Sequence, residues 1–242
     1  MSRISIVMSY YNRKKLLDVT LSTIEKSSIK DYELIIVDDA SDEPLVCPQA
    51  KVIRIDKKDK WYHNPCIPYN IGFREAKGEI IVIQNPECLH VEDVLKHVYD
   101  NARKNLYLSY ACYAINEKET KALYEHGTMP YMKSSVFESI GLKPEWNGWY
   151  NHERYRPVAY HFCSAILKED LDRIGGGFDE RYAHGVAFDD NEFIRRIKRN
   201  NLEVQIIRHP YVIHQYHSHF AYDDPKVWRP LYAINQRLFN TT

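Results

Sequence analysis

The stretch ELIIVDDASDE, residues 33–43, decides how the first half of the chain folds. It begins with the apolar run Leu34–Val37, which is rich in β-branched residues, and passes directly into acidic and turn-forming residues. Similar apolar runs occur at Ile4–Met8, Val52–Ile55 and Ile80–Ile83. Short runs of this composition are typical of strands that are buried on both faces. We therefore expect these four runs to be strands of a parallel sheet.

Helical patterns separate these runs. Lys14–Ser28 carries apolar residues at helical spacing, Pro68–Lys77 reads as a short helix that a glycine closes, and Val91–Lys104 has one apolar face. The order strand, helix, strand is thus repeated along the chain. This order predicts an α/β fold with a doubly wound sheet in the first half.

The second half has a different pattern. The stretch Gly127–Pro157 is long for a loop and rich in aromatic residues, so we expect it to cover another part of the protein. No repeat or linker divides the chain, which predicts one domain, 1–242, with functional halves 1–115 and 116–242. The elements expected here are strands at Tyr107–Ile115, Tyr160–Leu167, Val204–Ile207 and Tyr211–Tyr216, a helix at Asp190–Asn200, and an amphipathic tail at Pro225–Phe239 that docks back on the domain.

Composition excludes several classes of protein. The 242 residues include 33 basic and 33 acidic side chains, which leaves no cationic surplus for a dedicated nucleic-acid binder. No run of about 18 apolar residues is present to span a membrane, and the N-terminal apolar stretch is too short for a secretory leader. The five cysteines form no CxxC pair, which favours reduced thiols. We expect a soluble cytoplasmic protein, with a peripheral membrane contact and the oligomeric state left open.

Polar side chains follow three of the predicted strands. The first strand runs into Ser9–Tyr11, the second into Asp38 and Asp39, and the fourth into Asn85–Glu87. Open parallel sheets bind ligands at the carboxyl ends of their strands. No glycine-rich turn follows the first strand and no GxxxxGK[ST] motif occurs, so ordinary dinucleotide and P-loop sites are excluded.

Five segments together resemble one protein family. They are SIVMSYYNRKKLLDVTLSTI (5–24), ELIIVDDASDE (33–43), NIGFREAKGEIIVIQNPE (70–87), GGFDERY (176–182) and FDDNEF (188–193). In this order they resemble the family 2 glycosyltransferases of the GT-A fold. The resemblance implies a Rossmann-like, mostly parallel central sheet flanked by helices, with a smaller acceptor-side half.

The same resemblance implies an activity. It points to an inverting hexosyltransferase that moves one sugar from a nucleotide-sugar donor to a hydroxyl of a glycan or lipid-linked acceptor, as in polysaccharide biosynthesis. Processive members of the broad family carry membrane helices and a QxxRW motif, and this sequence has neither. Single additions are therefore expected.

The resemblance also implies roles at the donor end. Ser9, Tyr10, Tyr11 and Asp39 match the positions that hold the base and ribose, with the Asp39 carboxylate accepting from a ring N–H. Asp38 either shares this role or only caps the turn that follows its strand.

Asn85-Pro86-Glu87 stands where the family carries its DxD motif. The resemblance implies that Glu87 holds Mn²⁺ or Mg²⁺ beside the leaving diphosphate, while Asn85 contacts ribose directly or through water. Because the amide of Asn85 carries no negative charge, the site either holds the ion weakly or needs the nucleotide to complete it. A late histidine often completes such sites, with His214 as the first choice and His217 as the alternative. Strand alternation puts the two on opposite faces, so both cannot serve unless the backbone bulges. Arg74 either touches phosphate or lies on a solvated helix face.

Asp189 and Asp190 begin a predicted helix, where acids also satisfy free backbone N–H groups. The resemblance assigns the catalytic base to Asp190 and leaves a capping role for Asp189. A base at this point takes the proton of the acceptor hydroxyl during in-line attack, which inverts the anomeric carbon and needs one carboxylate.

Acceptor contacts are expected from Trp149, His184 and Gly185. With Trp146 and Tyr150, Trp149 forms either a lid over the sugar or a cluster under a long loop. Two rival functions stay open. One is a catalytically degenerate member that binds nucleotide or glycan, and the other is a nucleotidyltransferase, which needs a glycine-rich basic loop that this sequence lacks.

Overall fold

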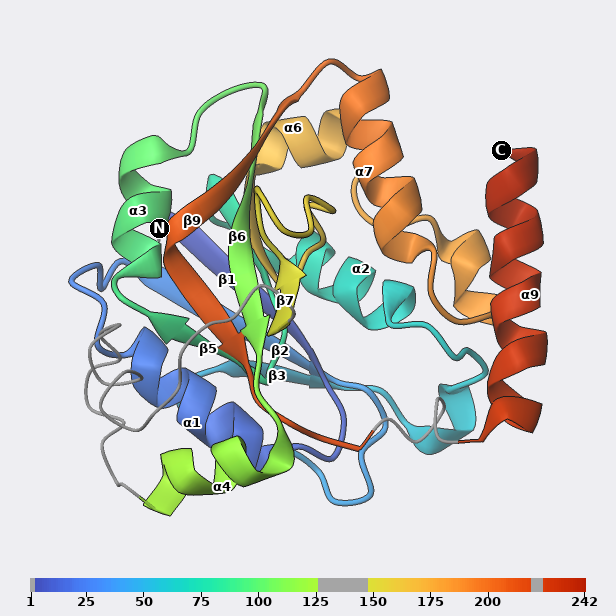
Figure 1. Ribbon diagram of the computed structural model, residues 1–242, viewed down its shortest axis with the longest axis horizontal. Helices are drawn as coiled ribbons and strands as arrows, with labels where there is room; N and C mark the ends of the chain where they lie inside the picture. Colours follow the sequence, from blue (N-terminus) through green and yellow to red (C-terminus); the bar gives the residue numbers. More distant parts are fainter. Residues whose placement is uncertain (1–2, 126–147, 219–223) are drawn as a thin grey trace.

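The computed structural model describes residues 3–125, 148–218 and 224–242. Their strands form one nine-stranded sheet in the order β3-β2-β1-β4-β8-β6-β9-β5, with β7 paired to β6. Figure 1 shows this sheet at the centre of the molecule, with helices packed around it. Strands from both predicted halves of the chain share this sheet.

The four predicted apolar runs form the parallel part of the sheet, as expected. β1 (Ile4–Tyr10) pairs in parallel with β2 (Tyr32–Asp38) and with β4 (Ile80–Gln84), and β2 pairs in parallel with β3 (Lys51–Arg54). Side chains of β1 enter hydrophobic clusters on both faces of the sheet. This two-sided burial explains why the runs are continuously apolar.

The remaining strands form a mixed sheet. β8 (Cys163–Leu167) runs antiparallel to β4, and β6 (Leu106–Ala114) lies between β8 and β9 (Glu203–His214). β5 (Cys88–Val91) pairs with β9 at the edge, and the short β7 (Trp149–Asn151) pairs with β6. In the β4–β8 pair the last residue of β4 lies opposite the first residue of β8. The carboxyl end of the parallel part therefore adjoins the start of a strand from the second half.

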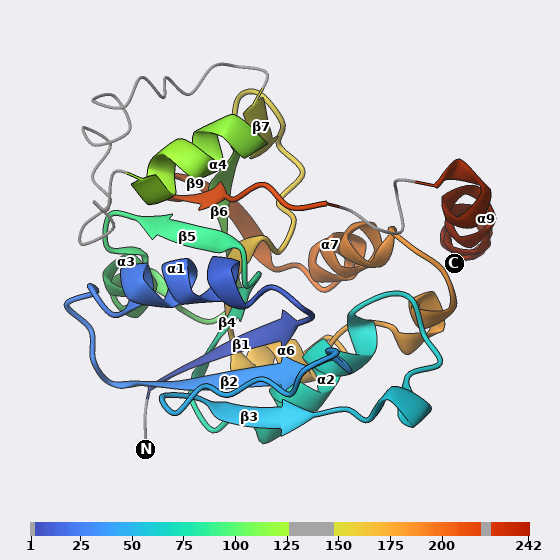
Figure 2. The same ribbon diagram turned by 90° about the horizontal axis from the view of Figure 1, so that it is seen from below.

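Helices cover both faces of the sheet. Figure 2 shows α1 (Lys14–Ile24) and α3 (Val94–Asn101) on one face, with α2 (Cys66–Glu75) and α6 (Lys168–Arg173) on the other. α7 (Asp189–Arg199) packs into the same core as α2. In the described part of the chain no helix is long and apolar enough to cross a membrane. The other helical segments are α4 (Glu117–Glu125), α9 (Pro225–Thr241) and the 3-10 turns η1 (Lys57–Asp59) and η3 (Glu180–His184).

The C-terminal helix α9 docks back on the domain, as its amphipathic pattern predicts. Asn235 is fully buried and donates to Tyr182 O (2.9 Å) and to Ala187 O (2.8 Å). Gly185 approaches α9 so closely that a Cβ would lie 2.4 Å from Leu231 O. α9 therefore braces the loop that leads into α7.

Some expected boundaries are wrong. The helix expected from Val91 begins only at Val94, because Val91 ends the edge strand β5 and Asp93 caps the helix. The two strands expected between Val204 and Tyr216 are the single strand β9, whose pairing with β6 is irregular between Tyr110 and Cys112. The strand expected from Tyr160 is β8, which begins only at Cys163. The elements α4, α6 and β7 were not expected from the sequence. Residues 126–147 of the long aromatic stretch lie outside the described residues.

Asn70 on α2 links α2 to Phe178, which lies in the second of the two predicted halves of the chain. Its amide donates to Phe178 O (2.8 Å) and accepts from Phe178 N–H (2.8 Å), which satisfies both backbone groups of a buried residue. Gly177 lies against this amide with φ +155°, and a Cβ there would be 2.2 Å from Asn70 Oδ1. A residue without a side chain is therefore required at this point.

We expect Asn70→Ala to lower the free energy of unfolding by about 2–4 kcal/mol, because both backbone groups of Phe178 would lose their buried partners. Urea unfolding followed by circular dichroism measures this loss. Asn101→Ala, in which an exposed amide at the end of α3 loses one bond to His97 O, is the matched control and should change stability by less than about 0.5 kcal/mol. Equal effects of the two substitutions would contradict the role of Asn70.

Asp38, the last residue of β2, organises the turn that follows it. Its buried carboxylate accepts from Ser41 N–H (3.1 Å) and Leu45 N–H (3.0 Å), and it pairs with Arg54 Nη1 at 2.5 Å. Burial by itself raises the pKa of Asp38. The hydrogen bonds from Ser41, Leu45 and Arg54 lower it by a larger amount, so the net pKa lies below the ordinary value. Of the two roles expected for Asp38, capping of this turn is the one its contacts support.

We expect Asp38→Asn to destabilise the protein by about 2 kcal/mol at neutral pH, because the hydrogen bonds to a charged oxygen are lost. A carboxylate with a depressed pKa stabilises the fold above the pKa of the unfolded chain, about 3.9, and this contribution disappears as the pH falls through the folded pKa. The difference from wild type should therefore stay nearly constant between pH 7 and about pH 4 and shrink only as the pH is lowered further. Asp42→Asn, which affects an exposed ion pair with Lys57, should show no such difference at any pH.

Candidate active site

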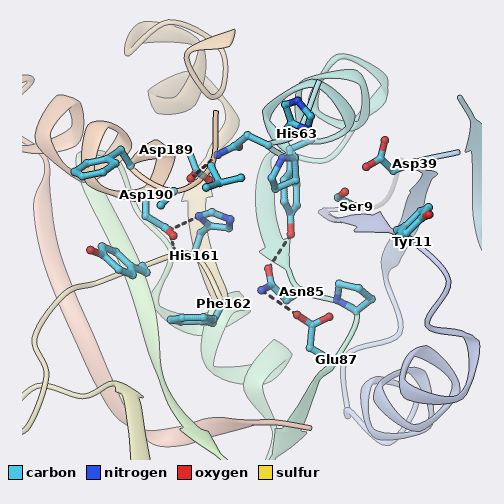
Figure 3. Close-up of a pocket in the computed structure, with 18 of the residues that line it drawn as sticks. Ser9, Tyr11, Asp39, His63, Asn85, Glu87, His161, Phe162, Asp189 and Asp190 are labelled. Carbon is cyan, nitrogen blue, oxygen red and sulfur yellow. Dashed lines mark hydrogen bonds and ion pairs between the residues drawn. The ribbon is translucent and has the colours of Figure 1, made fainter. Parts of the chain in front are cut away.

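A cavity of about 670 Å³ opens at the carboxyl ends of β1, β2 and β4. Figure 3 shows its side chains pointing inward from two directions, with Ser9, Tyr11 and Asp39 on one side and Asp190 and His161 on the other. The polar residues that follow the three strands thus meet at one edge of the sheet, as the parallel order predicts. The predicted site residues that line the cavity are Ser9, Tyr11, Asp39, Asn85, Glu87, Asp189 and Asp190.

Asp39 lies at the β2 end of the cavity and already has two partners. Tyr62 donates its hydroxyl to Asp39 Oδ1 (2.5 Å), and Lys60 Nζ donates to Oδ2 (2.6 Å). Burial raises the pKa of Asp39, although both neighbours act to lower it. Lys60 also stands 4.7 Å from the centre of the half-exposed Tyr11 ring. A carboxylate, an ammonium group and an aromatic face are therefore grouped at this end.

The segment that carries Asn85 and Glu87 is fixed from two sides. Asn85 N–H donates to Phe162 O (3.0 Å), which extends the β4–β8 pairing by one bond. The hydroxyl of Tyr69 on α2 lies 2.8 Å from Asn85 Oδ1, and Asn85 Nδ2 lies 3.4 Å from Glu87 Oε1. The amide of Asn85 thus links α2 to the carboxylate of Glu87.

Glu87 is a buried carboxylate with cationic and imidazole neighbours. Arg13 Nη1 donates to Oε2 (3.0 Å), while Oε1 lies 3.4 Å from His214 Nε2 and 3.7 Å from His217 Nε2. Burial by itself raises the pKa of Glu87, but Arg13 and the two histidines hold it well below the ordinary value. Glu87 is therefore ionised, with one oxygen held by Arg13 and the other facing two imidazoles.

Glu87, His214 and His217 fit a single cation. One ligand atom from each lies within 4.8 Å of the other two. The alternation argument that separates the two histidines does not hold, because β9 ends at His214 and the chain is no longer extended strand at residue 217. One carboxylate oxygen and two imidazole nitrogens are a donor set that divalent transition metals accept.

Two adjacent acids at the start of α7 have different surroundings. Asp189 is buried and accepts from Asn64 Nδ2 (2.8 Å). Burial and the nearby charge of Asp190 raise the pKa of Asp189. The Asp190 side chain is 24% exposed, and its Oδ1 lies 2.5 Å from His161 Nδ1. Both acids line the cavity, but the first is buried and held by Asn64, whereas the second is more exposed to the cavity.

The backbone before α7 is strained where these acids begin. Ala187 and Phe188 have φ of 61° and 66°, a left-handed conformation that side chains other than glycine seldom adopt. Both residues line the cavity. Asn235 of α9 holds Ala187 O, so the docked tail helps to maintain this turn.

Besides His214 and His217, five predicted site residues lie outside the lining of the cavity. Tyr10 is buried in the core on the α1 face of the sheet, and Arg74 is exposed and faces Glu180 at 3.8 Å. Gly185 packs under α9, and the His184 ring stands 4.9 Å from the exposed Trp61 ring. These positions give Tyr10 and Gly185 a packing role.

Trp149, the fifth, packs in a buried aromatic cluster. Its ring lies 5.1 Å from that of Tyr113 and 5.8 Å from that of Tyr211, measured between centroids. Of the two roles expected for Trp149, the structure shows the cluster. The Tyr150 ring lies 5.1 Å from that of His214, and Trp146 lies outside the described residues.

The cavity also contains side chains that sequence reasoning missed. Arg13, Tyr69, Arg156 and His161 all line it. Arg13 directly follows the polar segment after β1, so its position was a usable signal. His161 owes its place to the antiparallel pairing of β8 with β4, and the sequence pattern contains no sign of that pairing.

Comparison with known proteins assigns the family. The sequence profile described as Glycosyl transferase family 2 matches residues 5–175. The poly(ribitol-phosphate) beta-N-acetylglucosaminyltransferase TarP of Staphylococcus aureus is 25% identical over 156 residues, which cover 59% of this chain and 48% of that protein. The chondroitin synthase of Escherichia coli is 26% identical over 244 residues, which cover 88% of this chain and 34% of that protein. The chain thus spans less than half the length of these relatives.

Solved structures share the fold. The structure of S. aureus TarS 1–349 in complex with UDP-GlcNAc matches 90% of this chain and 59% of its own, with a TM-score of 0.62 and 14% identity. The mannosyltransferase PcManGT from Pyrobaculum calidifontis in complex with GDP-Man and Mn²⁺ matches 88% of this chain and 56% of its own, with a TM-score of 0.51 and 18% identity. Because the family profile covers most of the chain and the sheet has the GT-A arrangement, this chain belongs to glycosyl transferase family 2.

Proposed function

We propose that this chain transfers one sugar from a nucleotide-sugar donor to a hydroxyl group of a glycan or lipid-linked acceptor, with inversion at the anomeric carbon. The observation that carries the proposal is that Glu87 and Asp190 line the same cavity. In an in-line displacement the leaving diphosphate and the incoming hydroxyl flank one sugar, so the groups that serve them must share one space.

A UDP-sugar is the donor class that we propose first. TarS has been solved with UDP-GlcNAc and with UDP, and TarP is named as an N-acetylglucosaminyltransferase. In this chain the Asp39 carboxylate, a hydrogen-bond acceptor, lies beside the Lys60 ammonium group, a hydrogen-bond donor. This pair suits the adjacent N–H and carbonyl of uracil. The exposed Tyr11 ring offers a face on which the base can stack.

Asp190 is the group that we propose as the general base. Its carboxylate faces the cavity, whereas the neighbouring Asp189 is held by Asn64. As the hydroxyl oxygen bonds to the anomeric carbon, the hydroxyl proton passes to Asp190 and the bond to the diphosphate breaks. A direct displacement of this kind inverts the anomeric configuration and needs one carboxylate.

A divalent cation is the cofactor that we propose, with Glu87, His214 and His217 as the residues that hold it. When bound, such an ion neutralises charge on the leaving diphosphate. Two imidazole nitrogens favour Mn²⁺ over Mg²⁺, which prefers oxygen ligands. Because Arg13 already balances the charge of Glu87, we expect ion affinity to rise when the nucleotide adds its own negative charges.

The acceptor class that we propose is a glycan or a lipid-linked compound with a free hydroxyl group. Poly(ribitol-phosphate) and chondroitin, which stand in the names of TarP and chondroitin synthase, are both polymers, and these names support polysaccharide biosynthesis as the process that we propose. Tyr160, Phe188 and Tyr232 line the cavity near Asp190 and offer aromatic faces of the kind that pack against sugar rings. Arg156 lines the same region and provides a cation.

One observation favours a second function, a family member that binds nucleotide or glycan without turnover. Asn85 replaces an acid of the family motif, and Arg13 occupies the second oxygen of Glu87. Donor hydrolysis separates the two functions. UDP-GlcNAc, UDP-glucose, UDP-galactose and GDP-mannose would be incubated with and without Mn²⁺, and release of nucleoside diphosphate measured. Binding without release for every donor would favour the second function.

We expect Asp190→Asn to lower transfer or donor hydrolysis by about 10²- to 10⁴-fold, because the amide cannot accept the proton. Affinity for UDP, measured by calorimetry, should stay at the wild-type value, since the base acts on the acceptor. Asp172→Asn, on the exposed side of α6, is the control and should leave both quantities unchanged. A large loss of UDP binding in Asp190→Asn would assign this residue to the donor instead.

We expect Glu87→Ala to abolish the enhancement of UDP binding by Mn²⁺, because the only carboxylate of the proposed ion site is removed. Electron paramagnetic resonance of Mn²⁺ in the presence of UDP measures bound ion without relying on activity. Glu79→Ala, which removes an exposed carboxylate just before β4, should bind Mn²⁺ as wild type does. An unchanged Mn²⁺ signal in Glu87→Ala would place the ion elsewhere.

A further inference from the structure

His161 makes two contacts with the same oxygen of Asp190. The His161 backbone N–H donates to Asp190 Oδ1 (3.1 Å), and the ring Nδ1 lies 2.5 Å from that oxygen. Figure 3 shows the imidazole directly beside the carboxylate. Among the described residues, Oδ2 receives no hydrogen bond, so it is the oxygen left for a ligand in the cavity.

The ring of His161 is enclosed by the protein. It is buried, with the Phe178 ring 4.7 Å away and the edge of the Tyr69 ring 5.3 Å away. Burial by itself lowers the pKa of His161, but the charge of Asp190 raises it, and the net pKa lies above the ordinary value. The charge of Asp190 therefore favours the protonated form of the ring.

We propose that His161 is a positioning residue for the reaction: its backbone N–H, which donates to Asp190 Oδ1, and its ring Nδ1, 2.5 Å from the same oxygen, clamp that oxygen and so direct Oδ2 at the acceptor hydroxyl. This role rests on the proposed function, because it requires Asp190 to act as the base. It adds a residue that selects which acid, and which oxygen of that acid, accepts the proton.

Stability alone does not account for this pair. A buried ion pair gains little over well-packed apolar groups of similar size, because both partners lose their hydration. The rings of Phe178 and Tyr69 border the imidazole, so an apolar side chain at this position would contact apolar groups. The pair instead fixes a carboxylate at the wall of the cavity, and an orientation error of about 1 Å at such a group can cost about 100-fold in rate.

The clamp also separates Asp190 from its neighbour. Asp189 is tied to Asn64, and the nearby Tyr160 hydroxyl accepts from Asn191 Nδ2 (2.8 Å). Asp189 and Tyr160 therefore each have a partner other than Asp190. In the transfer step the hydroxyl O–H bond breaks, its proton binds Oδ2, the hydroxyl oxygen bonds to the anomeric carbon, and the diphosphate leaves with the electrons of the broken bond.

Two substitutions test the clamp. His161→Leu removes the Nδ1 donor, whereas His161→Asn keeps a side-chain N–H near the position of Nδ1. The donor is whichever of UDP-GlcNAc, UDP-glucose, UDP-galactose and GDP-mannose wild type hydrolyses fastest. We expect kcat to fall about 100-fold in His161→Leu with KM for the donor unchanged, and His161→Asn to recover at least a tenth of the wild-type kcat.

His97→Leu is the matched control. His97 also bonds through Nδ1, to the Tyr110 hydroxyl at 3.0 Å, but it lies on α3 and does not line the cavity. Its kcat and KM should equal those of wild type. UDP binding, followed by calorimetry, reports whether each variant is folded.

A spectroscopic measurement tests the contact without turnover. A proton held between Nδ1 and a carboxylate 2.5 Å away gives a strongly low-field proton resonance. We expect this signal in wild type and in His97→Leu, and its loss in His161→Leu and in Asp190→Asn. A wild-type spectrum without the signal would overturn the clamp.

Different results would contradict the proposed function and the positioning role of His161. If wild type hydrolyses none of the four donors, the proposed function falls and the role of His161 falls with it. If wild type is active and folded His161→Leu retains its kcat, only the positioning role is wrong. A fall in kcat that His161→Asn does not recover at all would also overturn it, because a donor N–H would then be insufficient.

Discussion

The arrangement of this site depends on burying one carboxylate, that of Glu87. A carboxylate without partners cannot be buried in a protein core, because the loss of its hydration is too costly. Here Arg13 at the start of α1 and the two histidines at the end of β9 surround it. Gln215 strengthens the junction, since its backbone N–H and side-chain amide both donate to Glu87 O. Satisfying this single charge therefore fixes three distant segments of the chain relative to one another.

The cavity has two chemically different ends because two types of strand pairing meet beside it. The parallel strands β1, β2 and β4 deliver their carboxyl ends to one rim, where the donor-side residues lie. The antiparallel β4–β8 pair then places the start of β8 next to the end of β4. His161, just ahead of β8, thereby comes within reach of Asp190 on α7. A purely parallel sheet would need a crossover between these strands and would send them in the same direction.

The sequence was sufficient to predict the part of the fold in which local pattern and topology agree. Continuous apolar runs identified the parallel strands, and the residues after them identified the donor-side rim. The edge strand β5 was missed because four residues beside an apolar helix give too little periodicity to separate the two. For Trp149 both a lid and a packed cluster stayed open for a different reason, since an aromatic side chain in a long segment carries no sign of the cluster that receives it. The contacts of Arg13 and His161 depend on residues far away in the chain, and no local pattern specifies them.

Asp189 and Asp190 show most directly why chemistry cannot be assigned from residue type alone. The two side chains are identical and adjacent, and successive residues of a helix point in directions that differ by about 100°. That rotation takes Asp189 inward to Asn64 and turns Asp190 towards His161 and the cavity. The left-handed turn at Ala187 and Phe188 fixes where the helix begins, and hence which acid receives which direction. The difference between a buried acid and a cavity-facing acid is thus set by the backbone before α7, which Asn235 of the docked C-terminal helix holds in place.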